Sequence, residues 1–285
     1  MNYRHAFHAG NFADVFKHAL LTRILLYVVQ KPAKMMMLDT HAGIGLYDLK
    51  SDEAQRSPEW QHGIARIAEA DLGAATELFA PYLKIALQGQ SEFHLNVYPG
   101  SPYVARDLLR PIDRLVLSEL HGLDADTLRE NMGRDKRVDV RHANGYASIK
   151  ALVPPLERRG LIFIDPPFEN PDEWDDMIGS VNLALGKWPT GTYALWYPLK
   201  NGNEGNALCE ALDQTKITKM LLLELQIQPC GAEGKHTRKG LSGCGMVVIN
   251  PPYVLAQEAE LMLPEMAKNL AIGESNWRVE WVKQS

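Results

Sequence analysis

The sequence reads MMMLDTHAGIG from residue 35 to residue 45. A short apolar run that ends at an acid, Asp39, is typical of a buried strand, and Gly43 and Gly45 predict a tight turn in which the backbone approaches a ligand closely. The third glycine of a dinucleotide-binding fingerprint is absent, which disfavours a dinucleotide. The turn suits the methionine half of S-adenosylmethionine, which has no pyrophosphate. A structural turn without a ligand is the alternative.

Similar short apolar runs recur along the chain, and stretches of helical character separate most of them. Alternating buried strands and helices predict an α/β fold with a doubly wound, mostly parallel sheet of seven strands. The seven runs are residues 35–39, 114–119, 138–140, 161–165, 192–197, 220–225 and 245–250.

Two helical regions are expected outside this alternation. One helix should begin near Asn11, a suitable N-cap, and end before Lys31-Pro32. In nucleotide-binding folds an acid that holds the ribose lies about 20 residues after the glycine turn. The candidate here, Glu119, lies roughly 70 residues after it. Residues 51–90 are rich in Ala, Glu, Leu and Ile at helical spacing, so we expect a helical insertion there, within a main domain of residues 1–50 and 91–285.

Composition and charge limit the class of protein. Of the 285 residues 46% are hydrophobic and 23% are charged, which is ordinary for a soluble globular protein. The net charge of −5 counts against a protein that coats nucleic acid nonspecifically, but it allows a local basic patch. Candidates for such a patch, or else plain surface charges, are Arg4, Lys17, Arg158, Arg159, Lys235, Arg238 and Lys239.

The cysteines and the apolar runs indicate a cytoplasmic protein that does not enter membranes. Cys209, Cys230 and Cys244 are an odd and sparse set, unlike a disulfide framework. No apolar run approaches the roughly 18 residues of a bilayer span. The first residues lack the pattern of a signal peptide.

Asp165-Pro166-Pro167-Phe168 follows the apolar run at 161–164 and is the most specific motif. The exocyclic amine of a nucleic-acid base is a poor nucleophile because its lone pair is delocalised into the ring. The Asp165 carboxylate and the Pro166 carbonyl can hold its hydrogens, and the two prolines make the turn rigid. Phe168 offers a flat face for a splayed-out base. The motif predicts methylation of a base amine; a proline-rich strand end with an acidic N-cap is the alternative.

Two other positions fit a nucleoside ligand. Glu119, at the end of a predicted strand, could accept hydrogen bonds from both ribose hydroxyls, although an acid at a helix N-terminus would look the same. Asn144-Gly145 could contact the adenine of the cofactor, and a plain Asn-Gly turn is the alternative.

Asn250-Pro251-Pro252-Tyr253 is a second copy of the motif. Only a short tail follows it, whereas a catalytic motif must precede further strands, so we place Asn250 at the end of a final, antiparallel strand. The glycines and basic residues of 228–243 predict a mobile loop before that strand. His5 and His8 lack a carboxylate or cysteine to complete a ligand set, so we expect no metal.

Several blocks of the sequence are shared with one family. They are YRHAFHAGN (3–11), ADV (13–15), KH (17–18), LDTHAG (38–43), YPGSP (98–102), SELH (118–121), RRGLI (158–162), IDPP (164–167) and ALWYP (194–198). On these blocks the chain resembles, over nearly its whole length, the bacterial large-subunit (23S) ribosomal RNA adenine-N6 methyltransferases, also described as DNA-utilisation proteins. The first block and the Pro-Gly-Ser-Pro segment are specific to this family.

The resemblance implies a Rossmann-like class I S-adenosylmethionine-dependent methyltransferase fold with a helical insertion. It implies that Tyr3 contacts the RNA, and we add Arg4 and Lys17 as RNA contacts and Gly43 as a cofactor contact. Family members usually have Asp at position 144 and Tyr at position 168. The implied cofactor contacts are His18, His41, Ser101, Glu119, Asn144, Gly145 and Asp165.

The sequence therefore predicts methyl transfer from S-adenosylmethionine to the N6 amine of an adenine in 23S ribosomal RNA, by a monomer. Cytosine-N4 and protein glutamine methyltransferases use related motifs, but they more often carry Asn or Ser where this chain has Asp165. A noncatalytic nucleic-acid utilisation factor that kept the fold is the alternative of another class.

Overall fold

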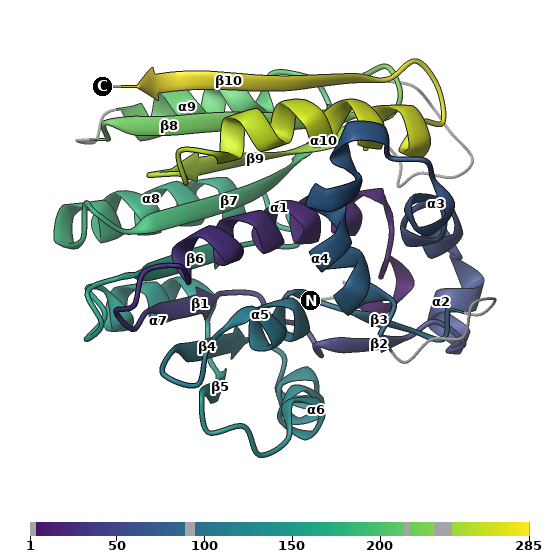
Figure 1. Ribbon diagram of the computed structural model, residues 1–285. Helices are drawn as coiled ribbons and strands as arrows, with labels where there is room; N and C mark the ends of the chain where they lie inside the picture. The colour runs from purple at the N-terminus through teal and green to yellow at the C-terminus, as the bar shows by residue number, and fades with distance from the viewer. Residues whose placement is uncertain (1–3, 89–94, 214–216, 231–240, 285) are drawn as a thin grey trace.

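A twisted sheet of eight strands forms the centre of the computed structural model, which describes residues 4–88, 95–213, 217–230 and 241–284 (Figure 1). The strand order is β10-β8-β9-β7-β6-β1-β4-β5. In chain order the strands are β1 (Met36–Asp39), β4 (Arg114–Glu119), β5 (Val138–His142), β6 (Gly160–Ile164), β7 (Thr192–Leu199), β8 (Lys219–Gln226), β9 (Gly243–Ile249) and β10 (Asn276–Gln284).

All seven predicted strands are present in this sheet, but the predicted number is one too low. Strands β5, β4, β1, β6 and β7 are parallel to one another, and β9 lies antiparallel between β7 and β8. The antiparallel direction of β9 was predicted correctly, whereas its place as the final strand was wrong. The eighth strand, β10, pairs only with β8 at the sheet edge. Its residues are exposed or half-buried, so it lacks the apolar run that marks the other strands.

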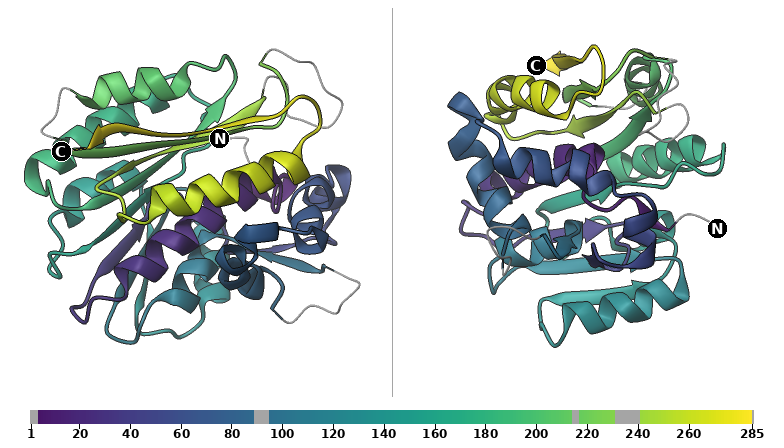
Figure 2. Two further views of the ribbon diagram at one scale, coloured as in Figure 1. Left: turned by 45° about the horizontal axis from the view of Figure 1, so that its top comes forward. Right: turned by 90° about the vertical axis from the view of Figure 1, so that its right-hand side faces the viewer.

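Helices cover both faces of the sheet and make two hydrophobic clusters (Figure 2). One face carries α1 (Phe12–Val28), α5 (Ser101–Leu108), α6 (Gly122–Met132) and α10 (Leu255–Leu270). The other carries α7 (Gly145–Leu152), α8 (Glu173–Lys187) and α9 (Glu204–Asp213). This is the doubly wound arrangement that the alternation of runs predicted.

Helix α1 begins directly after Asn11, as the sequence predicted. The Asn11 side chain caps the helix by accepting a hydrogen bond from the Asp14 backbone N–H. Thirteen of its 17 residues are buried, among them Asp14, Lys17 and His18. The helix packs against α5, α10 and a further helix, α4 (Thr76–Ala86). Polar side chains in such a position must find partners inside the protein, since water does not reach them.

Residues 51–90 are helical in their described part, as predicted. They form α2 (Asp52–Arg56), α3 (Ile64–Glu69) and α4 (Thr76–Ala86), with the short 3-10 turns η2 (Glu59–His62) and η3 (Gly73–Ala75). Two strands that the sequence analysis missed, β2 (Leu46–Asp48) and β3 (Val97–Pro99), pair antiparallel on either side of this segment. Phe79 and Tyr82 of α4 join the same hydrophobic cluster as α1. The division into two domains stays a prediction.

Among the described residues, no helix is both long enough and apolar enough to cross a membrane.

Candidate active site

A cavity of about 440 Å³ opens at the carboxyl ends of the parallel strands. Ligands of open α/β sheets bind at this edge, and the volume is in the usual range of small-molecule sites. The segments that follow β1, β4, β5 and β6, together with helix α1 and the start of α5, bring most of the predicted site residues to its wall. These are Lys17, His18, His41, Gly43, Ser101, Glu119, Asn144, Gly145, Asp165, Pro166 and Pro167.

The glycine turn after β1 is tied to the acid at the end of β4. Gly43 and Gly45 have positive φ angles of 59° and 77°, which favour glycine. The Gly43 N–H donates to one Glu119 oxygen at 2.9 Å, and the His121 N–H donates to the other at 2.8 Å. Burial raises the pKa of Glu119 above its ordinary value, although these two bonds favour its charged form. The carboxylate is thereby fixed in orientation at the cavity wall.

Asp39 at the end of β1 holds Ser101 from behind the turn. The Ser101 hydroxyl donates to Asp39 at 2.6 Å, and the His41 N–H donates to the other carboxyl oxygen at 3.2 Å. Burial raises the pKa of Asp39 to about 7. The sequence indicated an acid at this position but not its contact with Ser101, because Ser101 lies beyond the helical segment.

Two of the histidines that line the cavity, His41 and His18, are neutral at physiological pH. Burial lowers the pKa of His41 to about 4, and its Nδ1 lies 2.8 Å from the Thr40 hydroxyl. Burial also lowers the pKa of His18 to about 3. The His18 Nδ1 lies 2.7 Å from the hydroxyl of Tyr98, which in turn lies 3.0 Å from the hydroxyl of Tyr82.

Asn144 and Gly145 form the start of α7 at the cavity wall. The Asn144 side chain accepts a hydrogen bond from the Ala147 N–H at 3.1 Å, so it caps the helix as well as lining the cavity. A Cβ atom on Gly145 would lie 2.1 Å from the Thr40 carbonyl oxygen. Glycine is therefore required here for close contact with the end of β1 rather than for a turn.

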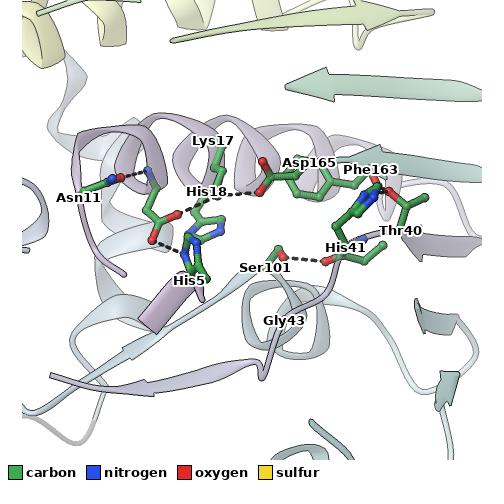
Figure 3. A network of polar contacts seen from close by, with 12 residues as sticks. His5, Asn11, Lys17, His18, Thr40, His41, Gly43, Ser101, Phe163 and Asp165 are labelled. Atoms are coloured by element: carbon green, nitrogen blue, oxygen red, sulfur yellow. Dashed lines mark hydrogen bonds and ion pairs between the residues drawn. The ribbon is translucent and has the colours of Figure 1, made fainter. Parts of the chain in front are cut away.

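Lys17 joins the predicted catalytic acid to helix α1 (Figure 3). Its Nζ lies 2.6 Å from Asp165 and 2.8 Å from Asp14. Burial alone would raise the pKa of Asp14, but His5 and Lys17 hold it well below its ordinary value. Lys17 is not part of a surface basic patch, because only 5% of the residue is exposed, whereas its contact with RNA stays a prediction because it lines the cavity. A buried cation needs counter-charges, and here they are the two aspartates.

Phe168 lies beside the cavity and does not line its wall. It has a positive φ of 50°, and its ring is 4.7 Å from that of Trp174 and 6.0 Å from that of Trp196. Trp196 does line the cavity, and Lys17 lies over its ring. Trp196 belongs to the predicted strand 192–197 and to a family block, but neither pattern indicated that it lines the cavity, since a tryptophan in an apolar strand looks like core.

The second copy of the motif lies at the opposite edge of the sheet. The Asn250 side chain donates to the carbonyl oxygens of Pro189 and Gly191 at 2.8 and 2.7 Å. It fastens the end of β9 to the start of β7. Asn250 therefore does not line the cavity, although the reason given from the sequence was wrong, because α10 and strand β10 follow it in the chain.

One predicted RNA contact, Tyr3, lies outside the described residues. The same holds for three candidates for a basic patch, Lys235, Arg238 and Lys239, and for the central part of the predicted loop 228–243. Arg4 is exposed and lies 3.6 Å from Glu53 of α2. No group of histidine, cysteine and acidic side chains suited to a metal occurs in the described part of the chain.

Comparison with known proteins identifies the family to which the chain belongs. Residues 32–283 match the family described as ribosomal RNA large subunit methyltransferase D, RlmJ. The chain belongs to the RlmJ family. The "Ribosomal RNA large subunit methyltransferase J" of Haemophilus influenzae is 39% identical over 284 residues, covering 99% of each chain. The protein of the same name from Escherichia coli is 39% identical over 283 residues, again covering 99% of each.

A solved structure of a Legionella pneumophila protein is similar throughout. It superposes with a TM-score of 0.85 at 35% identity, over 96% of this chain and 98% of that one. The RlmJ-family chain is a methyltransferase with the Rossmann-like class I fold that the sequence predicted.

Proposed function

We propose that this RlmJ-family chain transfers a methyl group from S-adenosylmethionine to the N6 amine of an adenine in large-subunit (23S) ribosomal RNA. The observation that carries the proposal is one cavity in which Asp165-Pro166-Pro167 faces the glycine turn and Glu119. The two relatives, named for ribosomal RNA methylation, support the substrate class.

The polar side chains of the cavity wall suit S-adenosylmethionine. Glu119 is oriented by two backbone N–H groups and can accept from the ribose hydroxyls. Asn144 lies at the wall beside the neighbouring strand end, where the adenine would lie. His18 and His41 are neutral, so they present hydrogen-bonding nitrogens without repelling the cationic sulfonium. When bound, the cofactor supplies an electrophilic methyl group on this sulfonium.

The protein's own part in the reaction is to position the amine. Lys17 holds one carboxyl oxygen of Asp165 at 2.6 Å, which leaves the other as an acceptor for an amine hydrogen. The Pro166 carbonyl can accept the second hydrogen from a turn that the prolines make rigid. With both hydrogens held, the nitrogen lone pair turns toward the methyl group, and the catalytic effect comes from positioning and fixed electrostatics. Phe168 or the neighbouring Trp196 offers an aromatic face for the base.

Asp165→Ala tests the assignment. The variant should bind S-adenosylmethionine, seen as a thermal shift, and transfer methyl groups at least about 100-fold more slowly. Asp175→Ala, an exposed acid on α8, is the matched control and should remain active. Mass spectrometry of nucleosides in ribosomal RNA from a deletion strain identifies the product. A folded, fully active Asp165→Ala protein would refute the catalytic role, N4-methylcytosine would refute adenine, and a wild-type protein without a thermal shift would favour a noncatalytic factor.

A further inference from the structure

The edge of the sheet opposite the cavity carries a concentration of positive charge. It is formed by the connections that precede β1, β4 and β6, which are neighbours because their strands pair (Figure 1, left side). The whole chain has a net charge of −5, so this edge has the opposite sign. We call it the basic edge, and its cations are Lys31, Lys34, Arg110, Arg114, Arg158 and Arg159.

Two arginines of the basic edge are held in place by backbone carbonyls. Arg110 donates to the carbonyl oxygens of Lys31 and Ala33 at 2.6 and 2.9 Å. Arg159 donates to that same Ala33 oxygen and, at 2.8 Å, to the carbonyl of Val28. Burial and the charge of Arg110 lower the pKa of Arg159 below its ordinary value. Two guanidinium groups from separate connections thus converge on one carbonyl oxygen, in fixed positions.

The carboxylates nearby do not balance these cations. Asp113 pairs with Arg110 at 2.8 Å and Glu157 pairs with Arg114 at 2.9 Å, and both acids have side chains exposed by less than a tenth. The other four cations of the basic edge form no ion pair with any carboxylate in the described part of the chain. Lys31, Lys34 and Arg158 are exposed, and Arg158 stands at a turn with a φ of 53°.

We propose that the basic edge binds the phosphate backbone of a ribosomal RNA segment other than the one whose base enters the cavity. The proposal rests on the proposed function. Phosphates are the partners that the exposed cations Lys31, Lys34 and Arg158 fit best, and a large ribosomal RNA can offer two segments at once. The six residues of β4 alone separate the two edges by about 20 Å, so the segment bound here is distinct from the target.

The test compares two RNA substrates and two triple variants. Lys31→Glu/Lys34→Glu/Arg158→Glu reverses charge on the basic edge. Arg56→Glu/Lys84→Glu/Lys268→Glu makes the same change in charge at exposed positions of α2, α4 and α10. The substrates are full-length large-subunit ribosomal RNA and a short fragment around the methylated adenine, located by mass spectrometry. Methyl transfer is followed as a function of salt concentration.

The basic-edge triple should raise KM for the full-length RNA at least about tenfold at 0.1 M salt and leave the short fragment within about twofold. It should also lower the slope of log KM against log salt for the long RNA by about two, since each lost phosphate contact removes roughly 0.7–0.9. The control triple should change neither substrate more than about twofold. An unchanged KM for the long RNA overturns the proposal, and so does an equal rise for both RNAs.

Filter binding of the full-length RNA separates this proposal from the proposed function. If the wild type methylates no RNA, the proposed function fails. Tighter RNA binding by the wild type than by the basic-edge triple would still support the proposal that the basic edge binds RNA. If the triple binds naked RNA normally but loses affinity for ribosomal particles, the partner is a protein and the RNA proposal is overturned. Should the reversed triple melt early, the corresponding alanine triple replaces it.

Discussion

Lys17→Met removes the cation between the two aspartates and keeps a side chain of similar length. Removing one partner of a buried ion pair costs about 3–5 kcal/mol of unfolding free energy. Asp14 keeps hydrogen bonds from the Gly10 N–H at 2.7 Å and from His5 at 3.0 Å, and the Asp165 side chain is 12% exposed at the cavity. We therefore expect the lower end, about 3 kcal/mol. In a chain of this size that corresponds to a fall in Tm of roughly 6–10 °C.

Activity should fall further than stability explains. Without Lys17 the Asp165 carboxylate is free to turn, and misplacing a positioning group by about 1 Å costs about 100-fold in rate. We expect kcat at 25 °C, where the variant is still folded, to fall by at least that factor. KM for S-adenosylmethionine should change much less. Lys84→Met, at an exposed position on α4, is the matched control.

A double variant distinguishes positioning from stability. Asp14→Asn in the Lys17→Met background removes the buried charge that is left unpaired and can still accept from Gly10, so much of the Tm should return. The kcat should not recover, because Asp165 still lacks its ion pair with residue 17. A single variant with kcat within about threefold of wild type, or a double variant that recovers kcat together with Tm, would refute the reasoning.

Three further outcomes follow from the site. Gly145→Ala places a Cβ atom 2.1 Å from the Thr40 carbonyl oxygen, so we expect a loss of several °C in Tm and weaker binding of S-adenosylmethionine by calorimetry. Tyr98→Phe removes the hydroxyl beside His18 and should raise KM for the cofactor several-fold, with kcat nearly unchanged. Folded Asp39 keeps its proton up to about pH 7, whereas the unfolded residue ionises near pH 4, so its contribution to stability falls as the pH rises between these values. Asp39→Asn cannot ionise, so urea unfolding should show its stability relative to wild type increasing from pH 4 to 7 and then levelling off.

The sequence predicted most of the strands and the location of the site because both depend on local patterns. A buried parallel strand must be a short apolar run, and a residue that follows such a run lies at the carboxyl edge of the sheet. Gly43, Glu119 and Asp165 each follow such a run, and the structure brings them to one cavity. Strand β10 has no such pattern because it is an exposed edge strand, and its pairing with β8 depends on tertiary contacts.

The charge of a residue gave no indication of where it lies. Lys17 and Arg158 both appeared as candidates for a basic patch, yet Lys17 is buried against two aspartates and Arg158 is exposed. Lys17 forms ion pairs with two aspartates. Asp14 lies three residues before it on the same helix, but Asp165 lies 148 residues away in the chain. A contact of that separation follows from the packing of α1 on the sheet, which no local pattern records.

Tyr98 and Tyr82 connect the helical segment of residues 51–90 to His18 in the cavity, a connection that no sequence pattern indicated. Tyr82 comes from α4 and Tyr98 from β3, and both are fully buried. Since Tyr98 lies within hydrogen-bonding distance of both Tyr82 and His18, the position of α4 influences the orientation of a cavity histidine. If this connection matters, Tyr82→Phe should weaken cofactor binding less than Tyr98→Phe, because it leaves the bond to His18 in place. Equal effects of the two changes, with equal losses of Tm, would instead mean that the tyrosines serve only the packing of the core.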